Sequence, residues 1–117
     1  MNNLSTKELT LYSNKILEDY DERQPGKIFK KKIKISNEEA LLIQANVAKL
    51  RKKRGEKIIG YKIGCISKNT QKKMGFIEPA WGNLWDSELH SNEVILNKIN
   101  YSNPAMEAEF GVILSRD

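Results

Sequence analysis

Residues 57–84 read KIIGYKIGCISKNTQKKMGFIEPAWGNL and bring together several glycines, one lysine between two of them, and a turn-rich segment. If 58–65 forms a strand, its two-residue period places Lys62 on one face with Ile58, Gly60 and Gly64. The opposite face is an apolar set: Ile59, Tyr61, Ile63 and Cys65. A ligand can approach a backbone that lacks side chains, so the pattern predicts an active site in which Lys62 acts on the ligand.

This strand has a second reading. The glycines can instead mark a β-bulge, with Lys62 pointing into water. Spacing alone does not choose between the two readings.

The composition indicates one globular unit over residues 1–117. Within it, residues 1–35 are expected to form a helical and extended N-terminal segment, and residues 36–117 carry the motifs. No apolar run approaches the roughly 18 residues of a membrane span, and no leader pattern is present, so we expect a cytoplasmic protein. The single cysteine, Cys65, agrees with a reducing compartment, and a buried, inert thiol is the expected role.

The formal net charge of +5 raises the possibility of a nucleic-acid-binding module. Basic residues cluster in 27–34 and again in 49–57. The first cluster has only Phe29 as an aromatic neighbour for base stacking, and the second follows a predicted helix, whose C-terminal end favours cations. We therefore interpret both clusters as solvated faces and keep nucleic-acid binding as an alternative.

Two capping boxes, Ser5-Thr-Lys-Glu8 and Ser36-Asn-Glu-Glu39, each precede apolar residues at helical spacing. The first predicts a helix over about residues 6–20. The second predicts a helix that ends near Gly55, where a C-terminal glycine belongs, with Gln44 as an ordinary polar position. The stretch after Gln24-Pro25-Gly26 is predicted to be extended as far as Ile35.

Beyond the predicted strand, Ser67 can cap a short helix that ends at Met74-Gly75. Pro79 and Gly82 then predict a loop that carries Trp81 near the ligand, while Trp85 is expected in the core. His90 is placed on a surface loop, and with one histidine and one cysteine zinc has no ligand set. Residues 94–96 are predicted as a short strand.

The stretch 106–114 alternates cleanly between apolar residues and a second set that contains Glu107, Glu109 and Gly111. As a strand, it would present both carboxylates from one face, about 7 Å apart at their Cα atoms. Paired carboxylates are ligands that Mg²⁺ and Mn²⁺ prefer. A solvated strand face is the alternative reading of the same pattern.

Several of these motifs together resemble the 2-keto-4-pentenoate hydratase (2-hydroxypenta-2,4-dienoate hydratase) family of the fumarylacetoacetate hydrolase superfamily. They are Gly60-Tyr-Lys-Ile-Gly-Cys-Ile-Ser-Lys, Gln71, Met74-Gly75, Pro79-Ala-Trp-Gly-Asn-Leu84 and Glu107-Ala-Glu109. The resemblance covers Ser36 to the C-terminus well and the first helix loosely. Where many relatives have an acidic residue directly after the proline, this chain has Ala80.

The resemblance implies an α+β fold in which N-terminal helices precede strands of a mixed β-roll. It implies a hydro-lyase of aromatic-compound catabolism that adds water to a 2-hydroxy-2,4-dienoate and yields a 4-hydroxy-2-oxo acid. Lys62 would be catalytic, Glu107 and Glu109 would hold Mg²⁺ or Mn²⁺, and Gly64, Trp81 and Gly82 would contact the substrate. Related 2-oxo-3-enedioate decarboxylases share these motifs, so decarboxylation is the alternative reaction.

Family members continue well past residue 117, and their third metal carboxylate lies in that later part. The resemblance therefore implies that this chain is the N-terminal portion of such an enzyme, either a truncated gene product or half of a split one. The missing partner would be a separate C-terminal half, and the complete enzyme is expected to be a homo-oligomer.

Overall fold

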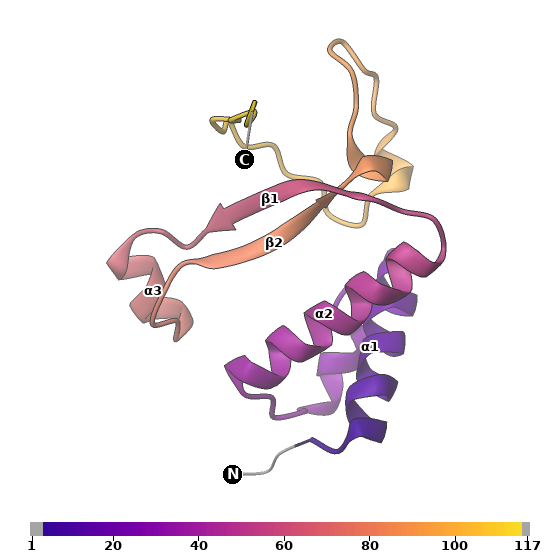
Figure 1. Ribbon diagram of the computed structural model, residues 1–117, viewed down its shortest axis with the longest axis vertical. Coiled ribbons are helices and arrows are strands. Elements are labelled where there is room, and N and C mark those ends of the chain that lie inside the picture. The colour runs from indigo at the N-terminus through magenta and orange to yellow at the C-terminus, as the bar shows by residue number, and fades with distance from the viewer. Residues whose placement is uncertain (1–3, 116–117) are drawn as a thin grey trace.

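The computed structural model describes residues 4–115 as an α+β arrangement of a helix pair and a β-hairpin (Figure 1). The helices are α1 (Thr6–Asp21), α2 (Asn37–Lys53) and the short α3 (Lys68–Met74), and the strands are β1 (Ile58–Gly64) and β2 (Ala80–Trp85). Three 3₁₀ turns complete the elements: η1 (Lys27–Lys31), η2 (Asp86–Glu88) and η3 (Lys98–Asn100). Within these residues no helix has the length and apolarity needed to cross a membrane.

Both capping boxes form as predicted. The Ser5 hydroxyl accepts from the Glu8 backbone N–H while the Glu8 carboxylate accepts from the Ser5 N–H, and Ser36 and Glu39 repeat this exchange. These bonds satisfy N–H groups that the first helical turn cannot pair. Local chemistry therefore sets the start of α1 and of α2.

The two helices lie side by side, and the segment between them folds back onto α1 (Figure 1). The extended structure predicted up to Ile35 is wrong, because this segment forms η1 and no strand. Gly26, with φ of 80°, turns the chain, and the Asp19 carboxylate accepts the Ile28 N–H at 2.7 Å. Ile28 is consequently buried beside α1 instead of joining a sheet.

The sheet described in residues 4–115 has two antiparallel strands, β1 and β2, joined through α3 (Figure 1). The α3 helix begins after Ser67 and ends at Gly75, as predicted. The loop predicted around Pro79 and Gly82 is wrong, because Ala80–Trp85 is a strand. Pro79 precedes the first paired residue, so its missing N–H costs no ladder hydrogen bond, and Gly82 pairs with Lys62.

A bulge between Ile58 and Gly60 changes which residues share a face of β1. Ile58 is opposite Trp85, whereas Gly60 is opposite Leu84, so the extra residue moves Ile58 away from the face that carries Lys62. The predicted grouping of Ile58 with Lys62 is therefore wrong. The strand also ends at Gly64, so Cys65 lies beyond it, half-buried and in a left-handed turn with φ of 54°.

The strands predicted over 94–96 and 106–114 are absent from the described residues. Residues 106–114 have no regular structure, and no neighbouring strand in 4–115 satisfies their backbone groups. Their apolar side chains are open to solvent: Met106 is 99% exposed and Ile113 is 96% exposed. The alternating pattern by itself is insufficient to form a strand without a pairing partner.

Arg51 joins the helix pair to the hairpin. Its side chain is only 8% exposed, and its guanidinium lies 5.0 Å from the centre of the Tyr20 ring and 4.3 Å from that of Trp85. It also donates to the carboxylates of Glu56 and Glu88. The interpretation of the second basic cluster as a solvated face is wrong at Arg51, because this residue is in the interior.

Trp85 is 5% exposed and so lies in the core, as predicted. Arg54, from the same basic cluster as Arg51, pairs with Asp21 and Glu56. Although burial alone would raise the pKa of Glu56, hydrogen bonds from Arg51, Arg54 and Ser87 outweigh that effect and lower it to about 2. The α2–β1 connection is thus held by charged groups.

We predict that Arg51→Met lowers the free energy of unfolding by about 3 kcal/mol, because it leaves two carboxylates without their buried cation. Urea denaturation followed by circular dichroism measures this. Lys52→Met removes a neighbouring exposed cation and serves as the matched control. A loss in Arg51→Met no larger than that in Lys52→Met would contradict the role given to Arg51.

The pKa of Glu56 also predicts acid sensitivity. Because the folded-state pKa is lower than the ordinary value of 4.5, the stabilisation is complete above about pH 5 and is lost as the pH falls toward 2. We expect the loss to be about 2 kcal/mol, since solvent screens part of the cluster. Unfolding measured between pH 6 and pH 2.5 should show a steeper decline in the wild type than in Glu56→Gln.

Candidate functional site

Lys62 lies on the face of the hairpin that carries Gly60, Gly64 and Gly82. A Cβ atom added at Gly64 or at Gly82 would meet no heavy atom within 4 Å. The surface beside the amine is therefore open, which is the feature that the sequence pattern predicted for a close approach of a ligand.

The C-terminal segment brings both predicted metal-binding carboxylates to this amine. Lys62 Nζ donates to Glu109 Oε1 at 2.5 Å and lies 4.0 Å from Glu107 Oε2. The three side chains are between 47% and 73% exposed. Residues separated by more than 40 positions in sequence thus form one charged cluster, although the segment that carries the carboxylates is not a strand.

The pKa of Lys62 is raised, first by the hydrogen bond to Glu109 and further by the charges of Glu109 and Glu107. Burial therefore does not depress the pKa of Lys62 below its ordinary value in this arrangement, and the side chain is 47% exposed. Lys62 here is an ammonium group that can donate hydrogen bonds and offset negative charge.

The carboxylates of Glu107 and Glu109 supply some, but not all, of the ligands that a hard divalent cation needs. Mg²⁺ keeps several waters and is commonly held through one or two carboxylates, and Glu107 and Glu109 provide two. Within residues 4–115 no group of three or more histidine, cysteine, aspartate or glutamate side chains converges on one point. A complete protein cage would need a further ligand from outside these residues.

The Trp81 side chain lies on the opposite face of the sheet from Lys62. Trp81 pairs with Ile63, and its ring meets that of Tyr61 edge-on at 5.9 Å between centroids. Of the three predicted substrate contacts, Gly64 and Gly82 therefore share the Lys62 face, and the Trp81 side chain does not. Tyr61 and Ile63, expected in an apolar wall, are 65% and 63% exposed on the Trp81 face.

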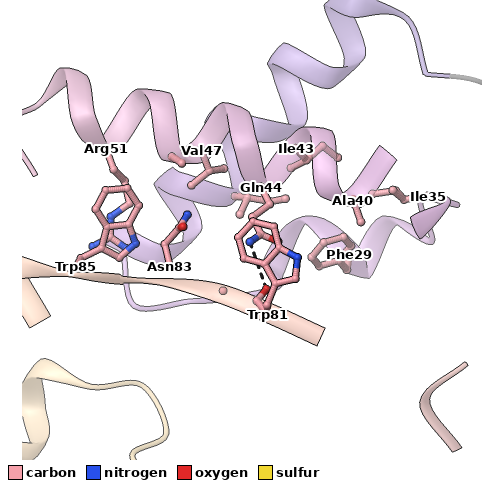
Figure 2. Close-up of a pocket in the computed structure, with 13 residues that line it drawn as sticks. Phe29, Ile35, Ala40, Ile43, Gln44, Val47, Arg51, Trp81, Asn83 and Trp85 are labelled. Atoms are coloured by element: carbon pink, nitrogen blue, oxygen red, sulfur yellow. Dashed lines mark hydrogen bonds between the residues drawn. The ribbon is translucent and has the colours of Figure 1, made fainter. Parts of the chain in front are cut away.

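Two glutamines have positioning roles that sequence reasoning missed. Gln44 donates from Nε2 to the Trp81 carbonyl at 3.3 Å and so ties α2 to β2 (Figure 2). Gln71 is 3% exposed and donates to the carbonyls of Cys65 and Ile66, which fixes the turn directly after Gly64. The signal available for Gln71 was its place among the family motifs.

No protein-family model matches the chain. The chain is 35% identical over 68 residues to 2-keto-4-pentenoate hydratase of Burkholderia vietnamiensis (strain G4 / LMG 22486), covering 58% of this chain and 26% of that protein. It is 34% identical over 84 residues to 2-hydroxypent-2,4-dienoate hydratase of Pseudomonas putida, covering 71% of this chain and 38% of that protein. The matched stretches thus span well under half of each relative.

Solved structures of 4-oxalocrotonate decarboxylase from Pseudomonas putida G7 resemble this chain in fold over part of their length. One, complexed with magnesium and adipate, matches with a TM-score of 0.65 and 23% identity. Another, complexed with calcium and acetate, matches with a TM-score of 0.61 and 26% identity. Each match covers 74% of this chain and 34% of the decarboxylase. The resemblance inferred from the motifs is therefore confirmed over a partial stretch.

Proposed function

We propose, from the premise that this chain is a homologue of part of the 2-keto-4-pentenoate hydratases, that it supplies one side of a hydratase active site. The reaction is addition of water to a 2-hydroxy-2,4-dienoate to give a 4-hydroxy-2-oxo acid. The observation that carries the proposal is the convergence of Lys62, Glu109 and Glu107 on the open glycine face of the hairpin.

Lys62 is suited to stabilising negative charge in this reaction. Addition of water to C4 of the 2-oxo-3-enoate tautomer pushes electrons toward the 2-oxygen, and an ammonium group beside that oxygen lowers the energy of the enolate. The proton lost by the water is regained at C3, so the net change is one added water. The exposed ammonium group of Lys62 on the open glycine face suits this electrostatic role.

Glu107 and Glu109 would hold Mg²⁺ or Mn²⁺, which when bound acts as a Lewis acid toward the substrate's carboxylate and 2-oxygen. Gly64 and Gly82 leave room for the planar substrate against the backbone. The described residues supply two carboxylates, so we propose that a further polypeptide stretch, in the same chain or in a separate C-terminal half, completes the site and the β-roll. The completed protein is proposed to be a cytoplasmic homo-oligomer in aromatic-compound catabolism.

Decarboxylation of a 2-oxo-3-enedioate is the second candidate. The fold likeness to 4-oxalocrotonate decarboxylase favours it, and loss of CO₂ also develops negative charge at the 2-oxygen. Lys62 would then act on the same enolate. The two candidates differ in whether water adds or CO₂ leaves, so product analysis separates them.

We predict that this chain, joined to the C-terminal remainder of one of the hydratase relatives, hydrates 2-hydroxypenta-2,4-dienoate in the presence of Mg²⁺. Loss of the dienoate's ultraviolet absorbance measures the reaction. Lys62→Met should reduce kcat by about 100-fold or more, whereas Lys57→Met, which removes another exposed lysine, should not. Release of CO₂ from a 2-oxo-3-enedioate without hydration would favour the decarboxylase, and turnover of neither compound would refute the enzyme proposal.

The metal ligands are tested separately by calorimetric titration with Mn²⁺. This chain alone should bind weakly, because two carboxylates leave most of the coordination to water, and the completed protein should bind more tightly. In the completed protein, Glu107→Gln and Glu109→Gln should each weaken binding by about tenfold or more and abolish metal-dependent turnover.

Two variants control that titration. Lys62→Met should retain Mn²⁺ binding, since it removes no oxygen ligand, and Glu78→Gln removes an exposed carboxylate outside the cluster. Unchanged affinity in both Glu107→Gln and Glu109→Gln would remove these residues from the metal site.

A further inference from the structure

A cavity of about 400 Å³ lies between α2 and the side of β2 that faces the helices (Figure 2). Trp81, Asn83 and Trp85 alternate along β2, so their side chains point to the same face, toward α2. Phe29 borders the cavity from η1, and Ala48 borders it from α2. Two of these wall elements, α2 and β2, are held together where Arg51 packs on Trp85.

The size and lining of this cavity are those of a small-molecule site. Ligand pockets usually measure about 300–1,000 Å³, and an engineered apolar cavity of about 150 Å³ already binds benzene. Trp81 is 51% exposed, so its ring is accessible to a ligand in the cavity mouth. A flat apolar molecule can stack on Trp81 and Phe29 with little loss of hydrogen bonding to water.

The polar groups in the lining are uncharged or already paired. Gln44 uses its Nε2 on the Trp81 carbonyl, and among the described residues the Asn83 amide has no hydrogen-bond partner. Arg51 is the charged residue of the lining, and its guanidinium bonds to Glu56, Glu88 and Ser87. A carboxylate entering the cavity would find no free cation, so the lining selects against anions.

We infer that this cavity binds an uncharged aromatic molecule of one or two fused rings that carries one hydroxyl or carbonyl group, with Asn83 as the hydrogen-bonding partner. The site lies on the opposite face of the hairpin from Lys62. It is therefore distinct from the proposed anionic substrate site, and its existence does not depend on the hydratase proposal.

Titration of the full chain with 2-naphthol, followed by quenching of tryptophan fluorescence, tests the inference. 2-Naphthol should bind with saturation at one molecule per chain. The anion 2-naphthoate should bind about tenfold more weakly or worse, because its charge would be unpaired in the cavity. Equal binding of the two compounds, or no binding of 2-naphthol, would overturn the proposal.

The location is tested with a matched pair of substitutions on α2. Ala48→Phe fills the cavity and should abolish saturable binding, whereas Ala45→Phe adds the same bulk at an exposed position outside the lining and should leave binding unchanged. Circular dichroism establishes that each variant is folded. As a second measure, the wild type should bind 2-naphthol more tightly than naphthalene, and Asn83→Leu, which keeps the branched shape of the side chain but removes its amide, should lose that preference. Loss of binding in Ala45→Phe but not in Ala48→Phe would place the ligand elsewhere.

Discussion

The buried guanidinium of Arg51 is the interaction on which the arrangement of the chain depends. It stacks between Tyr20 of α1 and Trp85 of β2 and donates to carboxylates in the α2–β1 connection and in η2. Only three apolar side chains in the described residues are buried, Ile28, Ile43 and Trp85, so the apolar core is small. A cation with two aromatic and two anionic partners compensates for that small core by joining four elements at one point.

This anchor also determines which way the hairpin faces. Because Trp85 is fixed against Arg51, the residues that alternate with it on β2, Asn83 and Trp81, also face α2. Lys62 and its neighbouring glycines must then face away from the helices, where Glu107 and Glu109 reach the amine. One strand pair thus separates an apolar, neutral cavity from a charged, open surface, and these two environments suit different classes of ligand.

Whether an element could be predicted depends on how far apart in the sequence its interacting residues lie. The capping boxes at Ser5 and Ser36 and the helix start at Ser67 depend on residues three or four positions apart, and all three helices form as predicted. The Ala80–Trp85 strand was missed because its pairing with β1, more than 15 residues earlier, overrides the turn preference of Pro79 and Gly82. Arg51 resembled its solvated neighbours because three of its partners, Tyr20, Trp85 and Glu88, come from distant parts of the chain. For residues 106–114 the error was the opposite one: a strand was predicted from the alternation of apolar residues, but no described strand pairs with this segment.

The residues of the candidate site could be proposed from the sequence, but their geometry could not. The glycine spacing around Lys62 and the Glu-x-Glu pair led to Lys62, Glu107 and Glu109 only together with the family resemblance, whereas the bulge before Gly60 and the position of Trp81 on the other face required the structure. Paramagnetic broadening of backbone amide signals by Mn²⁺ tests most directly whether Glu107 and Glu109 form a metal site beside Lys62. The residues whose signals broaden show where the ion lies, even when it binds weakly. Broadening should begin at Gly60–Gly64, Gly82 and residues 107–110 and leave α1 unaffected. Broadening that instead begins at the acidic first turn of α2, or uniformly over the chain, would contradict a metal site at Lys62.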